Sequence, residues 1–149
     1  MRVSTRGRYA LKIMLDLAMN EGEYMSLKGI ADRQGVSAKY LEQMITMLMS
    51  AKMIKSTRGK SGGYKLSRQP SEYTVGEILR ATEGSLAPIS CVEDSPNQCT
   101  ESCRCPTLFF WEGLNKVINE YIDGTTLEDV VNQEKTLNKE GQKHENICG

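Results

Sequence analysis

Two short helices joined by a two-residue turn constrain the fold of this chain more than any other feature. Ser26 and Ser37 are good N-cap residues, and the apolar pattern predicts helices over 27–34 and 38–51. Gly35 can end the first of these helices in the left-handed conformation. The second helix carries an apolar stripe at helical spacing, formed by Leu41, Met44, Ile45 and Leu48. Two helices separated by so short a turn must cross steeply, which is the helix-turn-helix arrangement.

A further helix and a hairpin flank this pair. Residues 5–20 are predicted to be helical and are apolar on several faces, so we expect burial on several sides, with a partner subunit as one candidate neighbour. After the pair, 54–58 alternates as a strand does, 64–66 can return beside it, and the residues between them are basic and rich in glycine. The sequence therefore predicts a mainly α fold with a small β-hairpin wing, a winged helix-turn-helix domain over 1–82.

The charge is segregated along the chain, although its formal net value is zero. Residues 1–68 hold thirteen Lys and Arg against five Asp and Glu, a net charge of +8, whereas 69–149 hold six against fourteen, a net charge of −8. Segregated basic charge of this kind is expected where a protein binds the phosphate backbone of nucleic acid. The alternative is a solvated basic face with no partner.

Polar side chains near the start of the second helix of the pair are candidates for reading base edges. Glutamine can pair with adenine, glutamate can accept a hydrogen bond from cytosine, and lysine can reach guanine or phosphate. The candidates on this face are Lys39, Glu42, Gln43 and Thr46. In the hairpin, Arg58 is the candidate for insertion into a minor groove. An ordinary polar stripe that faces solvent is the alternative for the helix.

The second half of the chain contains a long loop and a long amphipathic helix. Residues 83–106 have no periodic pattern and contain three prolines, so they are expected to form a loop. Residues 107–123 are predicted to form a helix, with a short helix after it that ends near residue 133. A second copy of the chain is the natural partner for the apolar face of the long helix, so we expect a homodimer; packing on its own domain is the alternative. The polar residues 134–149 are expected to form a flexible tail.

Four cysteines lie within fifteen residues of the loop: Cys91, Cys99, Cys103 and Cys105. In a reducing compartment such a group indicates metal ligands or reactive thiols, not structural disulfides. Structural zinc usually takes two closely spaced pairs, and only Cys99 and Cys103 have that spacing. Iron–sulfur sites tolerate irregular spacing within a loop. The pattern therefore favours an iron–sulfur cluster, with zinc and redox-active thiols as alternatives.

Three segments resemble a known family of regulators. Residues 3–10 (VSTRGRYA), 37–43 (SAKYLEQ) and 58–64 (RGKSGGY) are similar to the winged-helix regulator family that includes IscR, NsrR and CymR, and the similarity runs from residue 1 to about 133. In that family the Tyr-Leu-Glu-Gln segment lies on the recognition helix and the wing arginine enters the minor groove. The residues that the resemblance implicates in DNA binding are Tyr40, Glu42, Gln43 and Arg58. Lys39 is added because it lies on the same helix.

The resemblance also implies a ligand set. IscR-like and NsrR-like members carry three cysteines between the winged domain and the long helix, and these bind a [2Fe-2S] or [4Fe-4S] cluster. CymR-like members lack the trio and respond to a protein partner of cysteine metabolism. The matching residues here are Cys91, Cys99 and Cys105. The first interval is two residues longer than in the best-known members, and Leu108 stands where many IscR-like proteins have a histidine ligand. The fourth ligand is therefore open, with Cys103 and a carboxylate as candidates.

Together these features predict a homodimeric transcriptional repressor that binds double-stranded operator DNA and senses iron–sulfur cluster status, with [2Fe-2S] favoured over [4Fe-4S], to control cluster-assembly genes. An enzyme is disfavoured because the only histidine, His144, lies in the predicted tail and offers no Cys–His pair. The absence of a signal-peptide pattern and of a long apolar stretch predicts a cytoplasmic location. The alternative is a cluster-free regulator of cysteine or sulfur metabolism, gated by its thiols or by a protein partner.

Overall fold

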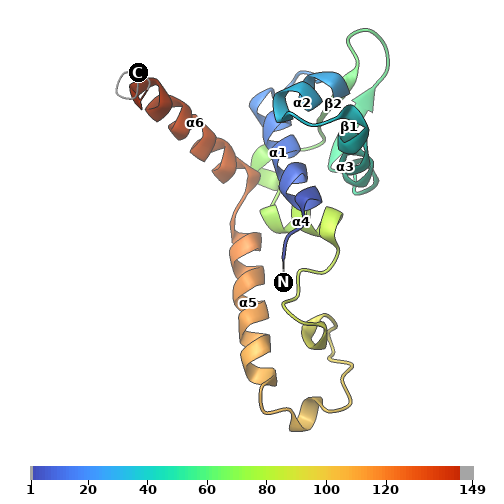
Figure 1. Ribbon diagram of the computed structural model, residues 1–149, viewed down its shortest axis with the longest axis vertical. Coiled ribbons are helices and arrows are strands. Elements are labelled where there is room, and N and C mark those ends of the chain that lie inside the picture. Colours follow the sequence, from blue (N-terminus) through green and yellow to red (C-terminus); the bar gives the residue numbers. More distant parts are fainter. Residues whose placement is uncertain (1, 145–149) are drawn as a thin grey trace.

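The computed structural model describes residues 2–144, which form six α-helices and one β-hairpin. In chain order the elements are α1 (Thr5–Met19), α2 (Leu27–Gln34), α3 (Ala38–Ser50), β1 (Ile54–Thr57), β2 (Gly63–Leu66), α4 (Val75–Glu83), α5 (Leu108–Gly124) and α6 (Leu127–His144), with short 3-10 turns at Pro70–Glu72, Ser90–Val92 and Ser102–Arg104. Figure 1 shows α1 to α4 and the hairpin gathered in one body, from which α5 projects; the loop before α5 runs back along that helix. The predicted winged-helix fold is confirmed: packed helices that include the helix-turn-helix pair are followed by an antiparallel hairpin.

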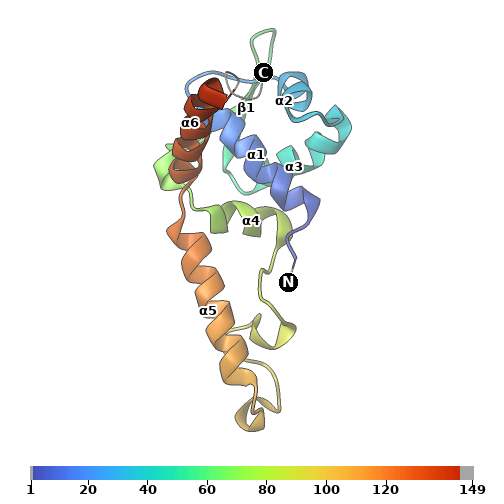
Figure 2. The ribbon, with the colours of Figure 1, turned by 60° about the vertical axis from the view of Figure 1, so that its left-hand side comes forward.

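The core lies around α1, whose apolar residues are buried on several sides as expected. Its neighbours are α3, α4 and α6 of the same chain, so the partner subunit that the sequence allowed for is not needed to bury it. Figure 2 shows α6 beside α1. The predicted stripe of α3, Leu41, Met44, Ile45 and Leu48, is buried against this helix. The apolar spacing of both helices thus places α3 firmly on the body with its polar face outward.

Local signals set the helix-turn-helix as predicted. The Ser26 hydroxyl accepts a hydrogen bond from the Gly29 amide (3.0 Å), and the Ser37 hydroxyl accepts one from the Tyr40 amide (3.1 Å). Gly35 ends α2 with a φ of 67°, the left-handed conformation that glycine adopts without cost. These caps fix where α3 begins and therefore which of its residues lie at the exposed end.

The wing is a two-stranded antiparallel hairpin that is tied to the segment after α1. Ile54 pairs with Leu66 and Thr57 with Gly63. The backbones of Met25 and Tyr64 exchange two hydrogen bonds of 2.8 and 2.9 Å. A Cβ on Gly63, whose φ is 153°, would lie 2.2 Å from the Met25 carbonyl oxygen. This close approach requires glycine and fixes the base of the hairpin against the body.

The C-terminal helix is longer than the sequence led us to expect. The flexible tail predicted from residue 134 is wrong as far as His144, because α6 continues to that residue; 145–149 lie outside the described residues. The helix is started by Thr126 and Asp129, whose side chains each bond the other's amide (3.1 and 2.8 Å), and Leu127 anchors it in the core. Once started, a proline-free run of good helix formers extends at little cost. None of the helices in the described part is long and apolar enough to cross a membrane.

Candidate nucleic-acid interface and cysteine loop

The predicted base-reading residues of α3 lie together on an exposed surface. The side chains of Lys39, Glu42 and Gln43 are exposed and, with Thr46, line a shallow open depression on this face of the helix. The Thr46 hydroxyl donates to the Glu42 carbonyl (2.8 Å), a bond within the helix that leaves the other three side chains available. A polar, exposed helix end of this kind is what a major groove accepts.

Tyr40 lies differently from its neighbours on α3. It is half-buried, and its ring meets that of Tyr9 edge to face, with centroids 5.9 Å apart and planes at 89°. The ammonium of Lys12 lies 5.3 Å from the Tyr9 ring centre. Tyr40 therefore fastens the start of α3 to α1. The sequence pattern did not reveal this pair, because the two residues are 31 positions apart and neither belongs to a helical stripe.

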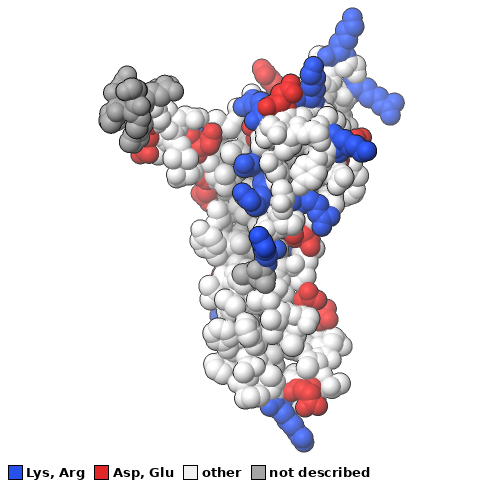
Figure 3. All heavy atoms as spheres, viewed as in Figure 1, with Lys and Arg blue, Asp and Glu red and all other residues white. Residues whose placement is uncertain are grey.

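The wing carries Arg58 away from α3. Arg58 follows β1 at the exposed end of the hairpin, and its side chain makes no ion pair with any of the described residues. Figure 3 shows the face of the molecule seen in Figure 1. On this face, Lys and Arg side chains gather over the winged-helix body, whereas Asp and Glu are more frequent over the rest of the molecule. The charge segregation seen in the sequence is thus also a segregation in space, which suits the body for a polyanion.

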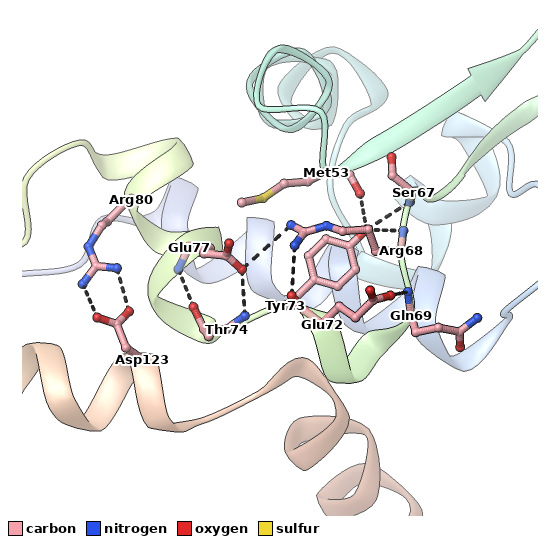
Figure 4. A network of polar contacts seen from close by, with 10 residues as sticks. All are labelled: Met53, Ser67, Arg68, Gln69, Glu72, Tyr73, Thr74, Glu77, Arg80 and Asp123. Carbon is pink, nitrogen blue, oxygen red and sulfur yellow. Dashed lines mark hydrogen bonds and ion pairs between the residues drawn. The ribbon is translucent and has the colours of Figure 1, made fainter.

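A buried tyrosine holds the base of the wing. Tyr73 is fully buried, and its hydroxyl donates to the Met53 carbonyl (2.6 Å) before β1 and accepts from the amides of Ser67 (3.0 Å) and Arg68 (2.9 Å) after β2 (Figure 4). The Arg68 guanidinium lies over the ring of the same tyrosine, 4.3 Å from its centre. All capacity of the phenol is used, so the hairpin cannot shift as a unit without breaking these bonds.

Helix α4 follows Tyr73 and is bound to α5 by an ion pair. The Arg80 guanidinium donates to both carboxylate oxygens of Asp123 (2.6 and 2.9 Å) and to the Asn119 side-chain oxygen (2.9 Å). Hydrogen bonding to Asp123 raises the pKa of Arg80, and the same bond lowers the pKa of Asp123. Figure 4 shows this pair on one side and the Tyr73 contacts on the other, with the Thr74–Glu77 contacts between them. A two-pronged pair of this kind fixes orientation as well as distance.

The C-terminal end of α4 is bound to the start of α1. The Glu83 carboxylate accepts hydrogen bonds from the Ser4 hydroxyl and from the Gly7 amide (2.9 Å). Burial raises the pKa of Glu83, but these bonds outweigh it and leave the pKa below its ordinary value. Ser4 precedes α1 at the capping position, but its hydroxyl bonds Glu83 and makes no cap bond of its own; Glu83 in turn accepts from an amide of the first turn.

The cysteine loop is exposed and its thiols are unpaired. Cys91, Cys99, Cys103 and Cys105 are all exposed and free. Cys91 and Cys99 border one hollow of about 230 Å³ together with Asp94 and Asn97. Cys103 lies in a 3-10 turn, and Cys105 follows that turn. Within residues 2–144, no three potential metal ligands stand close enough together to hold an ion.

Two observations bear on whether this loop suits a cluster. The donor set is chemically appropriate, since thiolates are the ligands of iron–sulfur clusters. In addition, the side-chain nitrogen of Asn97 is buried without a hydrogen-bond partner beside the Cys91 and Cys99 hollow, although its oxygen accepts from the Cys99 amide (2.8 Å). A buried donor without a partner next to two thiols suits an acceptor such as sulfur. The chemical types of these residues are therefore suitable for binding an iron–sulfur cluster.

Cys105 differs from the other thiols. Its sulfur lies 3.5 Å from the Thr107 hydroxyl oxygen, and hydrogen bonding by the Thr107 side chain and amide lowers the pKa of the Cys105 thiol. A lower pKa increases the thiolate fraction, which is the form that binds metals and reacts with oxidants. The Cys105 thiol is thus suited both to binding a metal and to reacting with an oxidant.

The long helix α5 presents an uncovered apolar face. None of its residues is buried, and the exposed fractions are 55% for Phe110, 61% for Val117 and 75% for Tyr121. These three residues recur at helical spacing, as the sequence predicted, and Leu114 and Ile118 on the same face are half-buried. An apolar face of this length on a projecting helix is typical of an association surface.

Comparison with known proteins identifies the family. The profile of the Rrf2 family, described as an iron-dependent transcriptional regulator, matches residues 3–133. The regulator CymR of Bacillus subtilis is 40% identical over 131 residues, covering 87% of this chain and 89% of that protein. The regulator IscR of Escherichia coli is 34% identical over 145 residues, covering 97% and 88% respectively.

Solved structures agree with this result. T. potens IscR gives a TM-score of 0.72 at 40% identity and covers 90% of this chain and 88% of that chain. B. subtilis CymR, described as a global cysteine regulator, gives 0.69 at 36% identity and covers 89% and 98%. The relatives are DNA-binding transcriptional regulators and not enzymes. This confirms the expectation of a DNA-binding regulator and the expectation that the chain is not an enzyme. This chain belongs to the Rrf2 family of winged-helix transcriptional regulators.

Proposed function

We propose that this chain is a homodimeric repressor that senses iron–sulfur cluster status through Cys91, Cys99 and Cys105 and controls cluster-assembly genes. The observation that carries the proposal is the position of the thiols, on an exposed loop that joins the DNA-binding body to the projecting helix α5. The family description as iron-dependent supports it. Reduced thiols persist in the cytoplasm, where we place the protein.

DNA would be bound by two elements of each subunit. Lys39, Glu42 and Gln43 face a major groove from α3, while Tyr40, whose ring packs on Tyr9, contacts DNA from the half-exposed side of the same helix. Arg58 on the wing reaches the adjacent minor groove. The apolar face of α5 pairs with its copy, and the resulting two-fold axis sets the spacing of the two half-sites.

The cysteine loop would signal whether a cluster is bound by becoming more or less ordered. A bound cluster, for which [2Fe-2S] is favoured over [4Fe-4S], would supply cross-links between distant points of the loop. Cys91 and Cys99 provide one part of the ligand set and Cys105 the other, with Cys103 as the candidate for the fourth position. Because the loop runs back along α5, ordering it would bias the position of that helix relative to the body.

A second function is favoured by one specific observation. The lowered pKa of the exposed Cys105 thiol, two residues from Cys103, suits a thiol switch without a cluster. The 40% identity to CymR agrees with this alternative, because its structure is described as that of a cysteine regulator. In this case the chain would control cysteine or sulfur metabolism, gated by oxidation or by a protein partner.

Anaerobic purification separates the two functions. We expect brown protein whose iron and sulfide contents are about two each per chain for [2Fe-2S], or about four each for [4Fe-4S]. Colourless protein without iron, even after reconstitution with iron and sulfide, would contradict the cluster and favour the thiol or partner-gated regulator. Colourless protein with zinc in place of iron would likewise contradict the cluster and favour that second regulator.

A further inference from the structure

Helix α4 contacts α1, α3 and α5, and also the segment that follows the wing. Its Arg80 binds Asp123 of α5, and its Glu83 binds the start of α1. At its N-terminal end, Glu77 lies 3.8 Å from the guanidinium of Arg68, the residue that follows the wing and is held by Tyr73. One short helix therefore joins the sensor side to the DNA side.

The contact between α4 and α5 also extends into the backbone. The Val75 amide donates to the Thr125 carbonyl (2.8 Å), and the Leu127 amide donates to the Tyr73 carbonyl (3.0 Å). Tyr73 thus bonds the wing through its hydroxyl and the α5–α6 connection through its carbonyl. This residue therefore connects the end of α5 to the base of the wing through hydrogen bonds on both sides, which gives a continuous path between the two.

The loop reaches the same joint. Arg80 and Asn119 border a hollow of about 250 Å³ that is also lined by the loop residues Ser85, Leu86, Ala87, Val92 and Glu93. The Asn115 side chain donates to the Val92 carbonyl (3.4 Å), which connects the loop directly to α5. The order of this part of the loop therefore bears on the side chain that binds Asp123.

We propose that the Arg80–Asp123 pair is the coupling element through which the state of the cysteine loop alters the position of the wing and α3. The inference rests on the proposed function, in that the loop must have two states, but it holds equally for a cluster and for a thiol switch. Exposed ion pairs contribute little to stability, whereas this one fixes the angle between two functional parts.

Gly76 offers a direct test of this joint. A Cβ at this position would lie 2.0 Å from an Asp123 carboxylate oxygen and 2.8 Å from an Arg80 guanidinium nitrogen. Gly76 is within a helix and has no positive φ, so alanine suits the backbone while its methyl group forces the ion pair apart. Gly124→Ala is the matched control, because Gly124 is next to Asp123 on α5 and a Cβ there meets nothing within 4 Å.

A second pair of variants changes charge instead of volume. Asp123→Asn weakens the joint, and Glu120→Gln is its control, because Glu120 lies on the same helix and, among the residues that the structure describes, pairs only with Lys116 one turn away (3.7 Å). For all four variants and the wild type, dissociation constants would be measured on one DNA duplex that the wild type selects from a random-sequence pool. Each would be measured with the loop loaded with cluster and after cluster removal, or with reduced and alkylated thiols if no cluster binds. Thermal melting and iron content serve as checks on folding and loading.

The measured quantity is the ratio of the two dissociation constants. In the wild type and both controls we expect a ratio of about tenfold, which in Gly76→Ala and Asp123→Asn falls to within about twofold of unity, with iron content unchanged. A wild-type ratio in either joint variant that folds and loads normally would overturn the coupling role while leaving the proposed function intact. Equal affinity of the wild type in both loop states would overturn the proposed function itself, and the coupling with it.

Discussion

The Tyr73 hydroxyl donates a hydrogen bond to the Met53 carbonyl at 2.6 Å, which fastens the first strand of the wing to the segment before α4. The same oxygen accepts two amide hydrogens from the residues after β2, so one buried phenol closes the hairpin from both ends. The position of the wing is therefore determined at its base, far from the exposed end that would meet DNA.

Replacing Tyr73 with Phe should lower the stability of the protein considerably, although it removes only one oxygen atom. The change keeps the ring but removes three hydrogen bonds of the phenol: the Arg68 amide loses its acceptor, whereas the Met53 carbonyl and the Ser67 amide keep their bond to each other (3.2 Å). We expect the free energy of unfolding to fall by about 1–3 kcal/mol. Urea or thermal unfolding followed by circular dichroism measures this. Tyr24→Phe is the control, because Tyr24 is half-exposed and contributes its ring face to Lys65 (4.6 Å). Equal stability of the two variants would contradict the role of the phenol.

Removing the Arg58 side chain should weaken specific DNA binding. Arg58→Ala is expected to cost about 1–3 kcal/mol on the selected operator and less on random DNA, if the guanidinium makes a specific minor-groove contact. Lys60→Ala in the same connection is the comparison, expected to weaken both DNAs equally. Fluorescence anisotropy at fixed salt measures both. An equal loss on both DNAs for Arg58→Ala would make it a phosphate contact.

The cysteine assignment predicts a pattern of iron loss. Cys91→Ala, Cys99→Ala and Cys105→Ala should each remove the visible absorbance and lower the iron content while leaving the helical signal and melting temperature of the body unchanged, because these thiols are exposed and outside the core. Cys103→Ala would show the same loss only if Cys103 is the fourth ligand. Unchanged iron content in all of the first three variants would contradict the assignment of these cysteines as ligands.

Glu83 makes stability depend on pH in a defined direction. Its pKa in the folded protein lies below the ordinary value of 4.5, so its stabilisation is complete above that value and is lost as the pH falls through the folded-state pKa. We expect Glu83→Gln to be less stable than the wild type by about 1 kcal/mol at neutral pH, with the difference disappearing in acid. Chemical unfolding across the pH range measures it, with the exposed Glu93→Gln as control. A difference that grows in acid would contradict the sign.

The apolar face of α5 predicts the effect of a buried charge on assembly. Val117→Asp would place a carboxylate in the proposed interface, where an unpaired charge is strongly unfavourable, so we expect the dimer to dissociate at micromolar concentration. Glu112→Lys, on the opposite side of the same helix, should leave the dimer intact. Sedimentation velocity distinguishes the two. A monomeric wild type would remove this face from the proposal altogether.

Local signals in the sequence were sufficient for most of the fold. Ser26, Ser37 and Gly35 act within one turn of the chain, so the helix-turn-helix could be predicted from spacing alone. The contacts of Tyr73, Arg80 and Glu83 could not, because their partners lie up to 79 positions away and follow no periodic pattern. The same limit applies to the cysteines, whose spacing suggests ligands but does not give their arrangement in space. The tail was missed because helix propagation from Leu127 outweighs the polar composition that follows it.

The loop before α5 leaves the body after Glu83 and joins the far end of the projecting helix at Leu108, and among its residues only Val92 is buried. The proposed signal receptor is thus a segment that contributes almost nothing to the core of the DNA-binding domain. Because the segment lies outside the core, we expect that its length and its ligands can be changed without refolding the domain that binds DNA. An engineer who exchanged this segment between relatives, and kept α4 intact, would change what the regulator detects while keeping the sequence that it reads.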